Sequence, residues 1–186
     1  MNLPIDFYLQ PTVEAARNIL GHRLLRKIDG QWVGGRIVEA EAYCHDDPAC
    51  HAFKGKTKRN EAMFGPPGRA YVYFTYGMHH CFNAVTSPEG CGEAVLIRAI
   101  LPEEGIDIMR HFRRGAEPLA AGPGRLCQAL NLHRDHTGID LTSPESELVI
   151  LQDRLEDGWN IVATSRIGIT NGKDKLWRFV AKPVRR

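Results

Sequence analysis

The sequence contains no long apolar run, and this absence excludes two classes of protein. Nowhere in its 186 residues do about 18 apolar residues follow one another, which is the least that a membrane-spanning helix needs. The N-terminal segment MNLPIDFYLQ also lacks the basic and then apolar stretches of a secretory signal peptide. We therefore expect an intracellular protein that has no membrane partner.

Cysteine is scarce, and its placement argues against disulfides and against a standard metal site. The five cysteines are odd in number and irregularly spaced, which predicts free thiols in a reducing compartment. Cys44-His45 and Cys50-His51 lie close together, but their spacing matches no tetrahedral zinc pattern. The zinc deaminase signature, a P-loop, a nucleophile elbow and a Rossmann glycine pattern are also missing. We expect no metal and no cofactor, and hence a hydrolysis that needs neither.

Charge is nearly balanced overall, but the basic side chains are clustered. A net charge of +2 and a pI near 8.3 permit binding to nucleic acid without requiring it. Residues 51–69 contain one acidic residue and five basic ones, Lys54, Lys56, Lys58, Arg59 and Arg69. Two further groups are Arg110, Arg113 and Arg114, and Lys182, Arg185 and Arg186. Such runs are usually solvated surface, and a phosphate-binding loop is the alternative.

Length and hydrophobic patterning predict one domain, 1–186, of the α+β class. With 43% hydrophobic content, the chain suffices for one core and is short for two. Residue patterns predict strands at 23–28, 32–43, 70–75, 80–85 and 94–100, short strand-like runs from 148 to 184, and helices at 13–20, 103–112 and 125–132. Thr12 is predicted to cap the first helix. Short connections favour a curved, mainly antiparallel sheet resembling an open barrel, with a protruding hairpin and a few packing helices.

The strand that ends in Glu-Ala-Glu-Ala-Tyr has an unusual polar face. Successive side chains of a strand point to opposite sides, so Glu39, Glu41 and Tyr43 are predicted to share one face. Small apolar residues occupy the other face. Two carboxylates beside an aromatic ring indicate the floor of a polar pocket, and a solvated strand edge is the alternative.

The segment from residue 70 to residue 83 predicts an aromatic hairpin with a glycine turn. Alternation places Tyr71 and Tyr73 on one face and Phe74 on the other. Aromatic residues on strands are usually core, and this is the interpretation for Tyr71, Phe74 and Phe82. Tyr76 falls at the tip of the hairpin, where a side chain has no core to join.

Three blocks of the sequence resemble one known family. They are EAEAYCHDDPACHAFKGKTKRNEAMFGPPGRAYVYFTYGMHHCFNAV, then AVLIRAILPEEG, then AGPGRLCQAL. In this order and spacing they resemble the alkyladenine (3-methyladenine) DNA glycosylase family of mammalian and bacterial enzymes. The resemblance implies a monofunctional glycosylase of base excision repair. Such an enzyme flips an alkylated or deaminated purine out of double-stranded DNA and hydrolyses its N-glycosidic bond, leaving an abasic site.

The resemblance also implies roles for individual pocket residues. The second glutamate of the E-x-E-A-Y motif, Glu41 here, activates the attacking water. Tyr43, His51 and Tyr73 enclose the flipped base, and Asn83 shapes which purines fit. The chain has one residue fewer than the mammalian pattern between the pocket tyrosine and histidine. The choice of histidine therefore rests on the Asp-Pro-Ala-Cys-His run, and the histidine that follows Cys44 is less favoured.

Contacts with DNA are implied for residues around the pocket. Tyr76 wedges into the gap left by the flipped base, Arg98 lies near the backbone of the flipped nucleotide, and Lys54, Lys56 and Lys58 bind phosphates. No lysine is placed as a Schiff-base nucleophile, so strand cleavage is not expected. We expect a monomer whose partner is double-stranded DNA with damaged purines, located in the cytoplasmic nucleoid of a bacterium or in the nucleus of a eukaryote.

Two other functions would use some of the same residues. A nucleoside N-ribohydrolase needs the carboxylate and the aromatic pocket, but neither a basic loop nor an exposed tip tyrosine. A non-catalytic binder of damaged DNA needs the loop and Tyr76 but not Glu41. Replacement of Glu41 by glutamine separates a glycosylase from such a binder.

Overall fold

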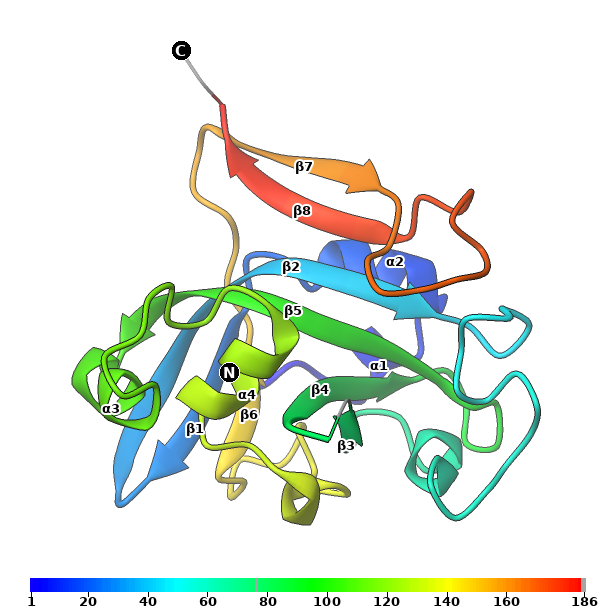
Figure 1. Cartoon of the computed structure of the whole chain (residues 1–186), viewed down its shortest axis with the longest axis horizontal. Helices are drawn as coiled ribbons and strands as arrows, with labels where there is room; N and C mark the ends of the chain where they lie inside the picture. The colour runs from blue at the N-terminus through cyan, green and yellow to red at the C-terminus, as the bar shows by residue number, and fades with distance from the viewer. Residues whose placement is uncertain (76, 185–186) are drawn as a thin grey trace.

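The fold is organised around one antiparallel sheet. The computed structural model describes residues 1–75 and 77–184. The strands are β1 (Arg23–Ile28), β2 (Gln31–Tyr43), β3 (Ala70–Thr75), β4 (His79–Thr86), β5 (Glu93–Glu104), β6 (Leu148–Leu151), β7 (Trp159–Thr164) and β8 (Arg178–Pro183). They pair in the order β3-β4-β5-β2-β1-β6, and β8 joins β7 to β2. In Figure 1, β2 and β5 cross the middle of the molecule between the β7–β8 pair and the β3–β4 hairpin.

The long strand β2 changes partners part-way along its length. Residues 31–36 pair with β1 and residues 39–41 with β8, while the opposite edge of β2 pairs with β5. Register shifts on both sides of Glu39 mark β-bulges, which bend a strand and increase its twist. A Cβ atom at Gly34 or Gly35 would lie 2.0 or 1.9 Å from a neighbouring carbonyl oxygen, so only glycine permits this close crossing. The predicted curvature of the sheet is confirmed, and it brings β8 over the acidic end of β2.

Helices occupy the connections between strands and cover the sheet. They are α1 (Ile5–Tyr8), α2 (Thr12–Asn18), α3 (Ile106–Phe112) and α4 (Pro123–Ala129), with the 3-10 turns η1 (Glu61–Phe64) and η2 (Arg134–His136). α2 packs on β2 and β5, and α4 packs on β4 and β5. Within residues 1–75 and 77–184, no helix combines the length and the apolar character needed to cross a bilayer.

Two predicted helix boundaries are wrong for local reasons. The helix predicted at 103–112 begins at Ile106, because Glu103 and Glu104 extend β5 and Gly105 turns the chain in a left-handed conformation with φ 63°. The helix predicted at 125–132 begins at Pro123, since proline suits the first turn of a helix. The actual start of α4 matters for the site, because its first residue, Pro123, lines the cavity described below.

The core consists of two buried clusters of different size. The larger one fills the space between the sheet and the helices. The smaller one, which we call the small cluster, contains Cys50, Ala52, Met63, Tyr71, Val85 and Ala94, and Tyr43, Phe64 and Tyr73 pack against it. The predicted burial of Tyr71 and Phe82 is confirmed. The prediction for Phe74 is wrong, since its side chain is 41% exposed on the outer face of the hairpin.

The prediction that Thr12 caps the first helix is also wrong. The helix begins at Thr12 itself, and the buried Thr12 hydroxyl donates to the carboxylate of Glu93 at the start of β5. Ser87 and the backbone N–H of His45 donate to the same carboxylate. Burial raises the pKa of Glu93, but the hydrogen bonds from Thr12, Ser87 and His45 lower it by more, so the pKa lies below its usual range. This carboxylate ties α2 to the ends of β2 and β4.

Replacing Thr12 with valine should reduce the free energy of unfolding by about 1 to 3 kcal/mol at neutral pH, because the buried Glu93 carboxylate loses a donor. The depressed folded-state pKa means that ionised Glu93 stabilises the fold above the usual carboxyl range, and that this contribution disappears as the pH falls through the folded-state value. The difference between the two proteins should therefore shrink on acidification. Urea unfolding at neutral pH and at about pH 3 measures it, and an equal loss at both would contradict this role of Glu93.

Candidate active site

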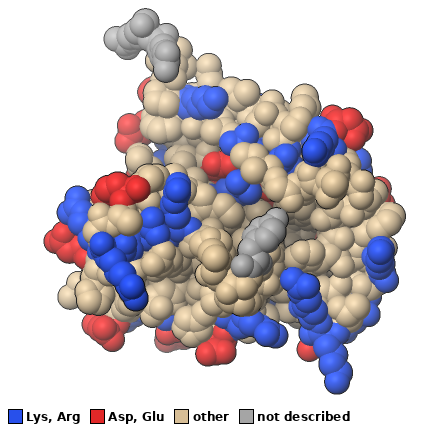
Figure 2. Space-filling model, viewed as in Figure 1, with Lys and Arg blue, Asp and Glu red and all other residues tan. Residues whose placement is uncertain are grey.

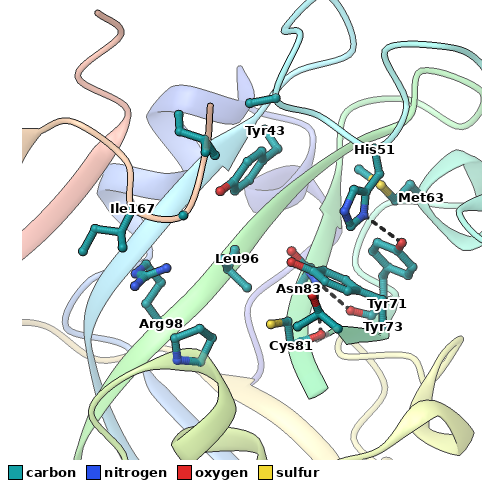
Figure 3. Close-up of a pocket in the computed structure, with 15 residues that line it drawn as sticks. Tyr43, His51, Met63, Tyr71, Tyr73, Cys81, Asn83, Leu96, Arg98 and Ile167 are labelled. Atoms are coloured by element: carbon teal, nitrogen blue, oxygen red, sulfur yellow. Dashed lines mark hydrogen bonds between the residues drawn. The ribbon is translucent and has the colours of Figure 1, made fainter. Parts of the chain in front are cut away.

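A cavity of about 290 Å³ lies where residues of β2, β3, β4 and β5 come together. The loop after β2, the first residue of α4 and the segment Ile167–Ile169 complete its walls. Figure 3 shows Arg98 and Ile167 on one side of the cavity and His51 and Tyr73 on the other. The cavity therefore has a charged side and an aromatic side.

The prediction that Glu39, Glu41 and Tyr43 share one face of β2 is confirmed. The guanidinium of Arg98 on β5 reaches both carboxylates, with Nε 2.7 Å from Glu39 Oε1 and 3.4 Å from Glu41 Oε1. The hydroxyl of Tyr43 donates to Glu41 Oε2 at 2.8 Å. Arg178 on β8 donates to Glu39 at 2.7 Å. Arg98 and Arg178 thus form ion pairs with the two carboxylates beside the cavity.

Glu41 is completely buried, at 0% exposure, directly behind residues that line the cavity. Burial of a carboxylate is costly unless it is paired and hydrogen-bonded, and here Arg98, Tyr43 and the backbone N–H of Ile167, 2.8 Å from Oε1, provide this compensation. A carboxylate has about four acceptor positions. The guanidinium of Arg98 reaches both oxygens, with Nε 3.4 Å from Oε1 and Nη1 3.5 Å from Oε2. These two longer contacts, together with those of Tyr43 and Ile167, occupy the four positions.

The two side-chain partners of Glu41 hold their protons firmly. Burial lowers the pKa of Arg98, but the charges of Glu41 and Glu39 and the hydrogen bond to Glu39 raise it by more, so the guanidinium stays charged. Burial, followed by the charge of Glu41, raises the pKa of Tyr43, so its phenol remains a donor. Neither partner competes with Glu41 for the role of proton acceptor.

The aromatic side of the cavity consists of edge-on and tilted rings. The ring centroids of His51 and Tyr73 are 4.5 Å apart in an edge-to-face arrangement, and His51 Nδ1 lies 3.2 Å from the Tyr71 hydroxyl. Burial lowers the pKa of His51, and the charge of Arg59 lowers it further, so the imidazole is neutral at neutral pH. The alternative histidine, His45, lies against Glu93 and lines no part of the described cavity.

Asn83 presents one defined atom to the cavity. Its amide nitrogen donates to the backbone carbonyls of Tyr71 and Cys81, at 3.0 and 3.4 Å. These bonds fix the orientation of the amide. The side-chain oxygen takes no part in these two bonds.

Sequence reasoning missed the segment Ile167–Ile169, which closes one wall of the cavity and donates a backbone N–H to Glu41. It also missed Met63 and Pro123 as lining residues. The segment lies more than a hundred residues beyond the acidic strand. Because the donor is a backbone N–H, the residue type does not predict the contact. The only available signal was a glycine between two isoleucines after a short strand-like run.

Comparison with known proteins identifies the family. The family model described as methylpurine-DNA glycosylase matches residues 6–184. A relative from Carboxydothermus hydrogenoformans, provisionally named 3-methyladenine DNA glycosylase, is 48% identical over 184 residues, which cover 98% of this chain and 96% of the relative. A relative of the same name from Methanoculleus marisnigri is 45% identical over 185 residues, covering 98% and 96%. The chain belongs to the methylpurine-DNA glycosylase family.

Membership in this family identifies the reaction class. The chain is a DNA glycosylase, a hydrolase of N-glycosyl bonds that acts on damaged DNA. The resemblance found in the three sequence blocks is thereby confirmed. The cavity with Glu41 behind it is the candidate for the active site of this glycosylase.

The residues considered as metal ligands have other partners in the glycosylase. His45 Nδ1 lies 2.6 Å from Glu93, and the Cys50 thiol donates to a backbone carbonyl. Asp47, which lies between them in the sequence, pairs with Arg166. In the part of the chain that the structure describes, no three His, Cys, Asp or Glu side chains form a group that could hold a metal ion. These side chains instead hold the loop after β2 in place.

Basic side chains gather in separate groups on the surface. Lys54, Lys56 and Lys58 are exposed in the loop after β2, and Arg59 donates to the backbone carbonyl of Phe74 on the hairpin. Figure 2 shows blue side chains at the lower right and a second group at the left, over α3 and α4. α3, α4 and the residues between them carry Arg110, Arg113, Arg114 and Arg125.

Two residues predicted to contact DNA need separate comment. Tyr76, the predicted wedge, lies outside the described residues, as do Arg185 and Arg186. Arg98 lies inside the cavity, with 11% of its side chain exposed and its guanidinium held by Glu39 and Glu41. A nucleotide would meet Arg98 only after entering the cavity.

Replacing Arg98 with methionine should destabilise the fold by about 3 to 5 kcal/mol at neutral pH, because it leaves two buried carboxylates without the cation between them. Arg178→Met should cost less, since it removes a partner of Glu39 alone. Adding Glu41→Gln to Arg98→Met should restore part of the loss by removing a buried charge. Urea unfolding of these variants tests the pairing, and strictly additive losses in the double variant would contradict it.

Proposed function

We propose that the glycosylase removes alkylated or deaminated purines, 3-methyladenine among them, from double-stranded DNA by monofunctional hydrolysis. The observation that carries this proposal is the buried Glu41, compensated by Arg98 and placed behind an aromatic cavity. An ionised carboxylate at this place suits a general base, and the cavity suits one planar ring system. We propose that the glycosylase acts as a monomer located at the cell's DNA.

The aromatic side of the cavity supports recognition of the base. An electron-rich ring attracts a cationic purine by roughly 0.5 to 2 kcal/mol, and Tyr43 and Tyr73 both offer such rings. A charged imidazole would repel the same purine, but the lowered pKa of His51 keeps its ring neutral. The Asn83 oxygen adds one polar contact that depends on the edge of the purine. Selection between damaged and normal bases thus takes place inside the cavity.

Hydrolysis follows from the position of Glu41. A water in the cavity attacks the anomeric carbon of the flipped nucleotide while the bond from that carbon to the purine nitrogen breaks. The purine leaves with the bonding electrons, and Glu41 takes a proton from the water. The carboxylate also favours the positive charge that develops on the sugar. Arg98 and the N–H of Ile167 hold Glu41 in place during this step.

DNA contacts outside the cavity complete the proposal. Flipping costs a few kcal/mol, least for weakly paired bases, and we assign Tyr76 as the wedge that fills the vacated gap. Lys54, Lys56 and Lys58 bind backbone phosphates without reading sequence, and Arg98 meets the sugar-phosphate of the flipped nucleotide. No lysine lines the described cavity, so the abasic strand is expected to remain intact.

Replacing Glu41 with glutamine should slow the release of 3-methyladenine and hypoxanthine from duplex oligonucleotides by about 10²- to 10⁴-fold, because the amide cannot accept the proton of the water. Single-turnover assays in EDTA at saturating enzyme measure the rate. Binding to the same duplex should remain.

Three outcomes would redirect the assignment. Unchanged release by Glu41→Gln would contradict the role of Glu41. Tight binding of damaged duplex without release by the wild type would indicate a binder. Release from free nucleosides but not from duplex would indicate a nucleoside hydrolase.

Replacing Lys54, Lys56 and Lys58 together with glutamine should weaken binding to damaged and undamaged duplex alike. The slope of log affinity against log salt should decrease by about 0.9 for each phosphate that the loop no longer neutralises. Fluorescence anisotropy over a range of salt concentrations measures this, with Lys27→Gln on β1 as a control. A weakening confined to damaged duplex would show that the loop reads the lesion instead of the backbone.

A further inference from the structure

Arg166 is a buried cation that has no part in the catalytic proposal so far. Its side chain is 0% exposed, as is that of its ion-pair partner Asp47 in the loop after β2. Its guanidinium also donates to the carbonyl of Ala42 at 2.9 Å and to the carbonyl of Gly172 at 3.3 Å. Arg166 therefore connects the end of β2, the following loop and the loop between β7 and β8.

Two aromatic rings contact the same guanidinium. Arg166 Cζ lies 4.9 Å from the ring centroid of Tyr43 and 5.2 Å from that of Trp177. Tyr43 lines the cavity and Arg166 does not, so the cation meets the Tyr43 ring from behind the cavity wall. A planar guanidinium suits this place, since it stacks on rings and forms several hydrogen bonds at once.

The neighbouring residues connect this cation to the catalytic carboxylate. Ile167 follows Arg166 directly, its N–H donates to Glu41 at 2.8 Å, and the wall segment Ile167–Ile169 continues from it. The Asp47 carboxylate offsets the charge of Arg166 through one oxygen, and Lys175 Nζ lies 3.7 Å from the other. This offset matters for a cationic purine on the other face of the Tyr43 ring, because two uncompensated cations would compete for the same ring.

We propose that Arg166, paired with Asp47, is a positioning residue that fixes both the Tyr43 ring and the Ile167 N–H against Glu41. The proposal rests on the proposed function, because it gives Arg166 a role through the proposed base Glu41. A buried ion pair is often no more stabilising than an apolar replacement. Positioning of Tyr43 and Ile167 therefore explains the presence of the Arg166–Asp47 pair better than a gain in stability does.

Two variants disturb Arg166 in different ways. Arg166→Met removes the cation and keeps the length of the side chain. Gly172→Ala acts from outside, since a Cβ atom at this position would lie 2.8 Å from Asp47 Oδ1 and 2.9 Å from Arg166 Nη2. Gly158→Ala is the matched control, because its φ is also positive and no described atom lies within 4 Å of the added carbon.

Single-turnover release of 3-methyladenine at saturating enzyme is the measurement, together with anisotropy on undamaged duplex and thermal unfolding. A misplacement of about 1 Å at a reacting centre costs up to about a hundredfold in rate. We therefore expect Arg166→Met and Gly172→Ala to slow release by about ten- to a hundredfold, with binding to undamaged duplex unchanged. Gly158→Ala should release base at nearly the wild-type rate.

The possible failures are distinguishable. Wild-type rates in the folded variants would overturn the inference about Arg166 alone, and so would an equal slowing in Gly158→Ala. If Arg166→Met does not fold, Gly172→Ala decides the question. Absence of release by the wild type from any damaged duplex would overturn the proposed function and this inference together.

Discussion

The structure depends above all on compensating the carboxylate of Glu41, which is completely buried. A buried carboxylate stays ionised only where a cation and hydrogen-bond donors face it. Here they come from three elements: Arg98 from β5, Tyr43 from β2 itself, and a backbone N–H from the loop between β7 and β8. The curvature of the sheet brings these elements together. Without the bulges of β2, neither β8 nor this loop would lie over the acidic end of the strand.

The two sides of the cavity rest on different kinds of interaction. Its charged side is held by paired arginines and carboxylates, and directional contacts of this kind specify where each atom lies. Its aromatic side rests on the small cluster and on edge-to-face rings, which hold the rings by contact area instead. A cationic purine and an attacking water need these two environments at once, one electron-rich and weakly hydrated, the other polar and rigid.

Local patterns were sufficient to predict much of the fold and part of the site. Alternation along β2 placed Glu39, Glu41 and Tyr43 on one face, and the strand positions followed from β-branched and aromatic runs. The errors arose where a distant partner decides the outcome. The Thr12 hydroxyl donates to Glu93 on β5 instead of capping its own helix. The strand β5 also continues through residues 103 and 104, whose periodicity predicted a helix. The contact between Ile167 and Glu41 is made by a backbone N–H, so it could not be predicted from the residue type.

The separation of the core into two clusters has a consequence for how this enzyme diversifies. The small cluster, with Met63 and Tyr71, supports the aromatic wall but is distinct from the large core that holds the sheet and the helices together. Substitutions at sites without shared partners have nearly additive effects on stability. Changes in the small cluster therefore reshape the space offered to a purine while the main core retains its packing. Of the partners of Glu41, Tyr43 packs against the small cluster and is reached by such changes, while Arg98 and the backbone N–H of Ile167 come from outside it.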